Sequence, residues 1–181
     1  MIYDLPTALD VDGESYPIRS DWRAAIDIIC ALNDPDLDDL DKTVVVLGIL
    51  YEVQPENVAE AMNKAMWFIS CGQEEPKSKV KQPKLMDWEQ DFPLIISAVN
   101  KVAGKELRAE PYTHWWTFVG LYQSIGDSTF TQVVAIRKKL KSGKPLEKYE
   151  KEYYRRNRDI IDMKTRYSEA QKAIIEELTG R

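Results

Sequence analysis

The residues best suited to chemistry lie in the segment EPYTHWWTFVGLYQSIGDSTF at 110–130, where His114, the only histidine of the chain, directly precedes two tryptophans. A site of the serine–histidine–aspartate type would need His114 as its base, because the chain has no other imidazole. No nucleophile-elbow or oxyanion-hole pattern accompanies this histidine. We therefore favour a structural histidine, in the core or at a helix end, over a catalytic one.

Metal and phosphate sites have equally little support. Zinc bound by Cys30, Cys71 and His114 would need three distant ligands, whereas structural zinc sites show close cysteine or histidine pairs. The acidic run DPDLDDLD at 34–41 lacks the central glycine and the closing glutamate of a calcium loop. The eight glycines lie singly and form no phosphate-binding loop. The sequence therefore predicts no metal, no cofactor and no enzymatic activity.

A basic segment that also contains tyrosines is the strongest candidate for a binding surface. Residues 137–158 carry ten lysines and arginines against three glutamates, a balance of +7. Such side chains can contact phosphates and stack on bases, but the sequence pI near 5.1 and the lack of a known reading motif argue against nucleic acid. We rank a solvated helix face first, a protein partner second and nucleic acid third.

The charge of the chain is strongly segregated. Residues 1–76 carry four basic side chains against sixteen acidic ones, a balance of −12, whereas the segment 137–158 is basic. One interpretation is an acidic face on one copy that meets a basic face on another, or a charged partner. The other, equally favoured, is two solvated surfaces without a partner.

The hydrophobic pattern predicts a mainly α fold, with about seven helices and one short N-terminal β-hairpin. Leu9 and Val11 alternate on one side of the turn Asp12-Gly13, and Tyr16 and Ile18 alternate on the other. From residue 20 onward the apolar residues recur three and four apart, as in helices. No run approaches the roughly 20 apolar residues of a membrane span.

Three helices are predicted between 20 and 72. Ser20 is the expected N-cap of the first. Acidic residues at 36, 38 and 39 open the second helix, where they favour the positive end of the helix dipole. The buried stripe of this second helix is expected to be Leu37, Leu40, Val44, Leu47 and Tyr51.

The polar stretch QEEPKSKVKQPK at 73–84 interrupts the helical pattern and indicates an exposed linker. We divide the chain into an N-terminal hairpin and three-helix unit at 1–76, an exposed linker at 77–86 and a C-terminal helical unit at 87–181. Asp87 and Gln90 resemble a capping box that opens the next helix. Pro93 favours a later start, near Asp91.

An aromatic cluster follows in the C-terminal unit. Trp115, Phe118 and Tyr122 recur at spacings of three and four, which places them on one helical face. His114 then lies at the N-terminus of that helix. We predict that these four residues form a structural aromatic core.

The end of the chain could form one long helix from Pro145 to about Leu178. Leu146, Tyr153, Ile160 and Tyr167 recur every seven residues, but the second heptad position is too mixed for a self-sufficient coiled coil. We call this single regular heptad position, formed by Leu146, Tyr153, Ile160 and Tyr167, a half-seam. It is expected on a helix that docks against a partner. A break near Asn157 is the alternative.

Three stretches carry a resemblance to a known family: DLPTALDVDGESYPIRSDWR at 4–23, MDWEQDFPLIISAV at 86–99 and THWWTFVGLYQSIGDSTFTQVVAIR at 113–137. Together with the basic, tyrosine-rich C-terminal region, they resemble the "gene-product fifteen" family of tailed bacteriophages. This family is usually encoded between the major tail protein and the tape measure protein. The stretch at 73–84 has no counterpart in this pattern.

The resemblance implies a tail assembly chaperone or a related morphogenesis factor. Such proteins coat the tape measure protein before the tail tube polymerises and then leave. The implied protein is soluble in the host cytoplasm, self-associates, has no membrane contact and is absent from, or transient on, the mature virion. The alternative function is a nucleic-acid-binding or other regulatory interaction protein that uses residues 137–158. The hypothetical partner-binding residues are Leu146, Tyr149, Tyr153, Arg155, Arg156, Arg158, Ile160 and Tyr167.

Overall fold

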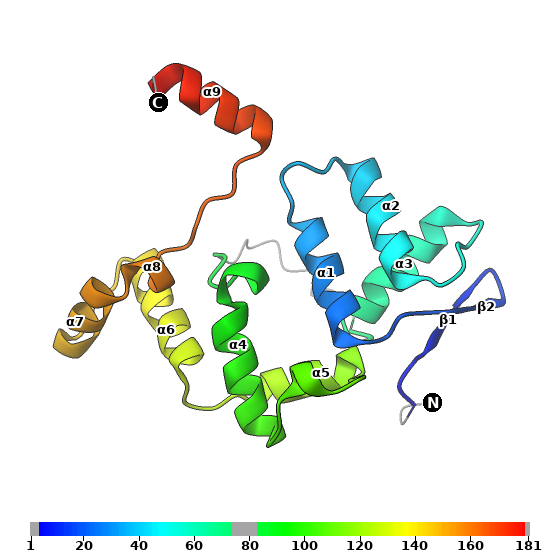
Figure 1. The fold of residues 1–181 in the computed structure, drawn as a ribbon, viewed down its shortest axis with the longest axis horizontal. Coiled ribbons are helices and arrows are strands. Elements are labelled where there is room, and N and C mark those ends of the chain that lie inside the picture. Colours follow the sequence, from blue (N-terminus) through cyan, green and yellow to red (C-terminus); the bar gives the residue numbers. More distant parts are fainter. Residues whose placement is uncertain (1–3, 74–82, 180–181) are drawn as a thin grey trace. The chain divides into compact units, whose positions relative to one another are not determined.

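The computed structural model describes residues 4–73 and 83–179, and these form a mainly α-helical protein (Figure 1). A hairpin of β1 (Ala8–Val11) and β2 (Glu14–Pro17) precedes the helices. The helices are α1 (Trp22–Leu32), α2 (Asp39–Leu50), α3 (Val58–Ile69), α4 (Trp88–Ala103), α5 (Trp115–Gln123), α6 (Thr129–Lys141), α7 (Lys148–Arg156), α8 (Arg158–Ile161) and α9 (Glu169–Thr179), with a 3-10 turn η1 (Leu107–Ala109). The predicted fold class is therefore confirmed. No helix in these two ranges is long and apolar enough to cross a membrane.

Residue contacts divide the chain into two compact units. The first contains residues 1–75, 112–116 and 165–181, and the second contains 76–111 and 117–164. The division falls inside α5, whose first two residues belong to the first unit. Residues 77–82 of the expected linker lie outside the described residues, and the division at 1–76, 77–86 and 87–181 stays a prediction.

The β-hairpin of the first unit closes through the predicted turn. Asp12 and Gly13 have φ of 53° and 82°, as a two-residue hairpin turn requires. The strands pair antiparallel, with Leu9 opposite Tyr16. Leu9 and Val11 are buried, and the Asp12 carboxylate accepts a hydrogen bond from the side chain of Asn57, just before α3. The hairpin is thus held on the helices of the first unit.

Helix α1 begins one residue later than the sequence suggested. Asp21, and not Ser20, is its N-cap, because the Asp21 carboxylate accepts the Arg23 backbone N–H. Ser20 is buried, and its hydroxyl shares a 2.8 Å hydrogen bond with the Tyr112 hydroxyl. The Ser20 carbonyl accepts the Trp115 backbone N–H at 2.8 Å. Ser20 therefore joins α1 to the segment before α5.

Helix α2 is rotated relative to its predicted stripe. Val46, Leu47, Leu50 and Tyr51 are buried, but Leu40 and Val44 are 72% and 63% exposed. The segment from 44 to 50 is apolar on nearly every side, so its sequence does not specify one face. Packing against α1 and α3 buries the face of α2 that contains Val46 and Leu50. The expectation that Leu40 and Val44 are buried is wrong for this chain.

The second unit has a small core between α6 and α8. Val133, Ile136 and Ile161 are buried at its centre. Helix α4 begins at Trp88, with Pro93 inside the helix, and not near Asp91 as the proline suggested. The Asp87 carboxylate caps α4, and the Asp91 carboxylate, in place of Gln90, accepts the Asp87 backbone N–H at 2.9 Å.

The C-terminal region is not one long helix. The chain leaves the helical path at Asn157 and again at residues 162–168, which gives α7, α8 and α9. Two side chains from elsewhere bind the carbonyls at the end of α8: Gln90 contacts the Asp162 carbonyl at 2.9 Å, and Arg137 contacts the Ile161 carbonyl at 2.7 Å. These carbonyls are no longer available to continue a helix. The half-seam of Leu146, Tyr153, Ile160 and Tyr167 therefore does not exist as a continuous stripe.

Candidate functional site

The segment with His114 lies beside the start of α1 in the first unit. The Asp21 carboxylate accepts the Thr113 backbone N–H at 2.9 Å, and the Thr113 carbonyl accepts the Trp22 backbone N–H at 3.0 Å. A residue that is 92 positions away in the sequence is thus fixed against the N-cap of α1. This pairing aims the three side chains that follow, His114, Trp115 and Trp116, into the unit.

His114 is buried, and both of its ring nitrogens are engaged. Nδ1 lies 3.0 Å from the Trp116 backbone N–H, so Nδ1 must accept. Nε2 lies 2.9 Å from the Pro6 carbonyl oxygen, so Nε2 must donate. This network assigns the tautomer with the proton on Nε2. The imidazole then has no free lone pair with which to accept a substrate proton or bind a metal.

The two tryptophans cap the C-terminus of α3. The Trp115 indole N–H donates to the Ile69 carbonyl at 2.9 Å, and the Trp116 indole N–H donates to the Phe68 carbonyl at 2.8 Å. The last carbonyls of a helix have no partner within the helix, and the Trp115 indole satisfies one of them at Ile69, whereas the Phe68 carbonyl also accepts the Cys71 backbone N–H at 3.1 Å. Gly72, with φ of 74°, completes the end of the helix: a Cβ there would lie 3.3 Å from both Trp67 and Trp116.

The rest of the predicted aromatic core lies in the second unit. Phe118 is fully buried, and the Tyr122 ring lies 5.2 Å from the Trp88 ring between centroids. Burial raises the pKa of the half-buried Tyr122, with a smaller contribution from Asp91. The structure thus places His114 and Trp115 in one unit and Phe118 and Tyr122 in the other. The structural role of these four residues stays a prediction.

Cys30 and Cys71 form no disulfide, and both side chains are half-buried. Cys30 lies in α1, and Cys71 follows α3 with a left-handed φ of 56°. In the described ranges, no group of three or more histidines, cysteines or carboxylates is arranged to hold a metal ion. The set of Cys30, Cys71 and His114 is therefore not assembled into a site.

The Cys71 thiol should react slowly in the native protein. Burial raises its pKa to about 11. The thiolate is the reactive species, so at pH 8 we expect alkylation about 100-fold slower than for an unperturbed cysteine, and a rate that rises as the pH approaches this pKa. Mass spectrometry of the peptide that contains Cys71, after iodoacetamide treatment with and without urea, compares the two rates. Equal rates would contradict the burial of this thiol.

A buried ion pair in the second unit was not predicted from the sequence. Arg137 on α6 and Asp91 on α4 are 2% and 1% exposed, and they form a bidentate pair at 2.6 and 2.9 Å. The guanidinium also donates to the carbonyls of Leu85, Ile160 and Ile161, so that all five of its N–H groups are used. The signal was present in the sequence, since Arg137 occupies an apolar position of the α6 stripe.

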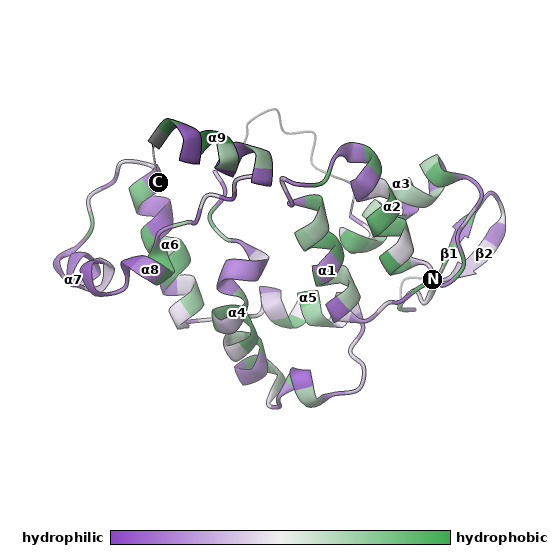
Figure 2. Ribbon diagram, turned by 45° about the horizontal axis from the view of Figure 1, so that its top comes forward, coloured by the Kyte–Doolittle hydropathy of each residue, from purple (hydrophilic) through white to green (hydrophobic). Residues whose placement is uncertain are grey.

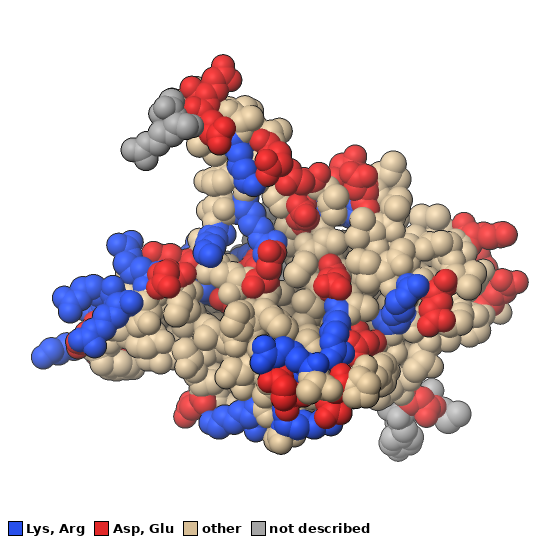
Figure 3. All heavy atoms as spheres, in the orientation of Figure 1, with Lys and Arg blue, Asp and Glu red and all other residues tan. Residues whose placement is uncertain are grey.

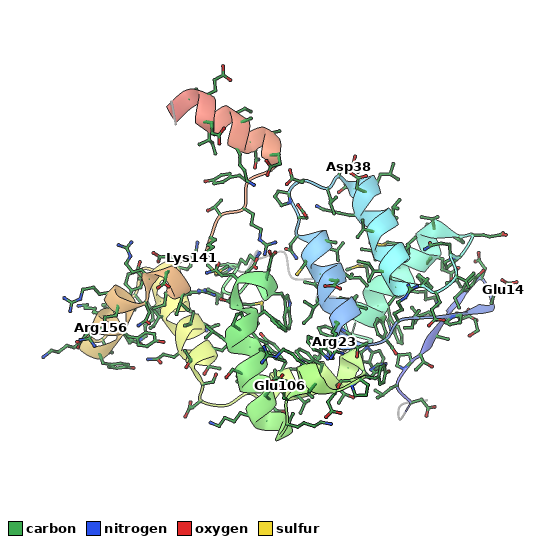
Figure 4. The ribbon with its side chains drawn as sticks, in the orientation of Figure 1. Glu14, Arg23, Asp38, Glu106, Lys141 and Arg156 are labelled. Carbon is green, nitrogen blue, oxygen red and sulfur yellow. The ribbon has the colours of Figure 1, made fainter. Side chains whose placement is uncertain are left out.

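The predicted partner-binding residues divide into buried and exposed sets. Leu146, Tyr153 and Ile160 pack partly buried against the core of Val133, Ile136 and Ile161. Tyr149 is 64% exposed, and the three arginines at 155, 156 and 158 are exposed. Tyr167 is also exposed but belongs to the first unit. We call Tyr149, Arg155, Arg156 and Arg158 the arginine surface, and Figure 4 labels one of them, Arg156.

Part of the positive charge of this region is neutralised within the chain. Lys139 pairs with the buried Glu150 at 2.7 Å, and this contact raises the pKa of Lys139 and lowers that of Glu150. Arg156 pairs with Glu152, and Arg158 with Asp162. Figure 3 shows lysine and arginine atoms gathered over α7, and Figure 2 shows α7 as a predominantly hydrophilic helix. The excess charge that remains is available to a partner.

The comparison with protein families gives one match. A family model described as "Bacteriophage Gp15 protein" matches residues 1–163. The chain therefore belongs to the bacteriophage Gp15 family, as the resemblance in its sequence suggested, and this membership indicates a bacteriophage protein. The match spans every element up to α8, whereas α9 lies beyond it. No curated protein and no solved structure matches the chain.

Proposed function

From the membership of the chain in the bacteriophage Gp15 family, we propose that it is a tail assembly factor that binds the tape measure protein of its phage. Copies of the chain cover the elongated tape measure in the host cytoplasm until the tail tube polymerises around it. They then leave, so that the protein is absent from, or transient on, the mature virion. This role needs no catalysis and no cofactor. The family match over residues 1–163 is the observation that carries the proposal.

The arginine surface is the part of the chain that we assign to the tape measure. Tyr149 supplies an exposed aromatic anchor, and tyrosine and arginine are enriched among the residues that dominate binding energies at interfaces. Arginine side chains can bind carboxylates through two parallel hydrogen bonds. We therefore expect the tape measure to present an amphipathic helix with acidic residues beside its apolar stripe. Leu146, Tyr153 and Ile160 support this surface from beneath.

Co-expression with the tape measure protein of the same phage tests the proposal. We expect the two proteins to co-purify, and the double variant Tyr149→Ala/Arg155→Glu to retain about tenfold less tape measure protein. Lys101→Glu is the matched control, because Lys101 is an exposed cation on α4 outside the arginine surface. Absence of co-purification with the wild-type chain would contradict the proposal. Equal loss in the control variant would contradict the assignment of the surface.

Nucleic-acid binding is the second candidate, and the exposed Tyr149 beside several cations favours it. Binding through phosphates would weaken by orders of magnitude between about 50 and 200 mM salt. We expect no shift of labelled single-stranded DNA or RNA in electrophoresis at low salt. A shift that disappears over this range of salt, and that is lost in Tyr149→Ala/Arg155→Glu, would favour the second candidate.

A further inference from the structure

Helix α2 of the first unit has an apolar face that stays exposed among the described residues of that unit. Leu40 and Val44 are 72% and 63% exposed, and they lie four residues apart, on one side of the helix. Leu37 precedes them and is half-buried, and Gly48 follows at the next position of the same row. We call Leu37, Leu40, Val44 and Gly48 the α2 face.

Gly48 is not required by close packing at its Cα among the described residues, and its carbonyl accepts a hydrogen bond from the Arg19 guanidinium at 3.1 Å. A Cβ at this position would meet no atom within 4 Å, and its φ lies outside the range that favours glycine. Glycine in a helix interior costs about 0.5–1 kcal/mol relative to alanine. Packing inside the chain therefore does not explain this cost. A glycine on an exposed helix face lets another backbone approach closely, which is consistent with a docking role for the α2 face.

The α2 face is bordered by negative charge. Residues 34–48 contain five aspartates against one lysine, Lys42. Among the described residues, none of the five aspartates forms an ion pair; they accept backbone N–H groups or are exposed, as at the helix cap formed by Asp38 and Asp41. Figure 4 shows Asp38 at the beginning of α2. The five aspartates are Asp34, Asp36, Asp38, Asp39 and Asp41. An occupant of the α2 face must therefore combine apolar and positively charged side chains.

The corner between α6 and α7 in the second unit has this chemistry. Leu140 near the end of α6 is 39% exposed. Five lysines surround it in the sequence, all are exposed, and none forms an ion pair in the described part of the chain. Figure 4 shows one of them, Lys141, where α6 ends. We call them the lysine row: Lys138, Lys141, Lys144, Lys148 and Lys151.

We propose that the α2 face of one copy docks on the lysine row and Leu140 of a second copy, so that the chain self-associates head to tail. The two surfaces match in kind, with exposed aliphatic side chains at the centre and charges of opposite sign around them. Lys172 attracts Asp34 and Asp36 within the chain, so Asp38, Asp39 and Asp41 are the main acidic residues for this contact. Because the surfaces differ, the contact is heterologous, and each copy keeps one free surface of each kind for further copies. Lys148 and Lys151 of the lysine row lie on α7 together with the arginine surface, and Lys151 is four residues before Arg155 on the same helical face, so self-association and binding of the tape measure share part of α7.

Sedimentation velocity of the purified full-length chain tests this contact without the tape measure, so its outcome is separate from that of the proposed function. At low salt we expect species that grow with concentration. At about 1 M salt, where the screening length falls to about 3 Å, we expect smaller species, since rim charges no longer attract. Both Leu40→Gln/Val44→Gln and Lys141→Glu/Lys144→Glu/Lys148→Glu should raise the dissociation constant at least tenfold, to a predominantly monomeric state. Lys101→Glu should behave as the wild type.

Mixing the two variants gives the sharpest result. Each variant alone lacks one surface, but the mixture restores one intact pair, the α2 face of the lysine variant with the lysine row of the α2 variant. We expect heterodimers and no larger species. Failure of the mixture to associate, or association of either variant alone, would overturn the head-to-tail contact.

Circular dichroism should show that all these variants stay folded, because every substituted residue is exposed. Gly48→Gln is a further variant that should raise the thermal midpoint of the monomer, through better helix propensity, while it weakens association. A wild-type chain that is monomeric at every concentration and salt would show that the α2 face is covered by the same chain or by nothing, and would overturn the proposal.

Discussion

Trp115→Ala is expected to lower the free energy of unfolding by about 3–5 kcal/mol, as for other truncated core aromatics. The side chain is 2% exposed, and its indole N–H satisfies the Ile69 carbonyl at the end of α3. The substitution therefore leaves a cavity and removes the indole donor from the partly buried Ile69 carbonyl. Urea denaturation followed by circular dichroism measures the change.

Trp67→Ala is the matched control for this experiment. Trp67 also lies at the C-terminal end of α3 and contacts the Trp116 ring edge-on, but its side chain is 41% exposed. We expect a loss of about 1 kcal/mol, since less of its surface leaves water on folding. If Trp115→Ala unfolds at the same urea concentration as the wild type but no longer binds the tape measure, the cluster around His114 is a functional surface and not a core.

Arg137→Met should destabilise the second unit by about 3–5 kcal/mol. The substitution leaves the Asp91 carboxylate, 1% exposed, without its partner, and a buried uncompensated charge is expensive. It also removes the donors that bind the carbonyls of Ile160 and Ile161. Thermal and urea unfolding measure the loss, and exchange of the amide hydrogens of α8 should accelerate.

Two further variants locate the origin of this effect. Asp91→Leu combined with Arg137→Met should be less destabilised than the sum of the single variants, because no unpaired charge remains. Arg156→Met removes an exposed ion pair with Glu152 and should change stability by no more than about 0.5 kcal/mol. A loss below about 1 kcal/mol in Arg137→Met would contradict the burial of this ion pair.

The parts of the fold that could be predicted from the sequence are those that depend on residues close to one another along the chain. The turn at Asp12 and Gly13 and the cap at Asp87 are local signals, and the structure forms a hairpin at the first and begins a helix at the second. The rotation of α2 was not predictable, because the run from 44 to 50 is apolar all round and only the packing of α1 and α3 selects a face. The end of α8 depends on Gln90, a residue 70 positions earlier.

The candidate site was predictable to a smaller extent. The sequence favoured a structural role for His114 and its tryptophans, but that the indoles cap α3 follows only from the folded chain. The heptad spacing of Leu146, Tyr153 and Ile160 was interpreted as a face for a partner, whereas these residues pack partly buried on the core of their own unit. Apolar periodicity predicts that a residue packs against another part of a structure, but it does not predict which element or partner that is.

Deletion of the gene from its phage tests the central claim, a role in tail assembly, most directly. Electron microscopy of the lysate, with tails counted per DNA-filled head, is the measurement. We expect heads without tails, and recovery of tails when the wild-type chain is supplied from a plasmid. Virions with tails of normal number and length in the absence of the chain would contradict the account.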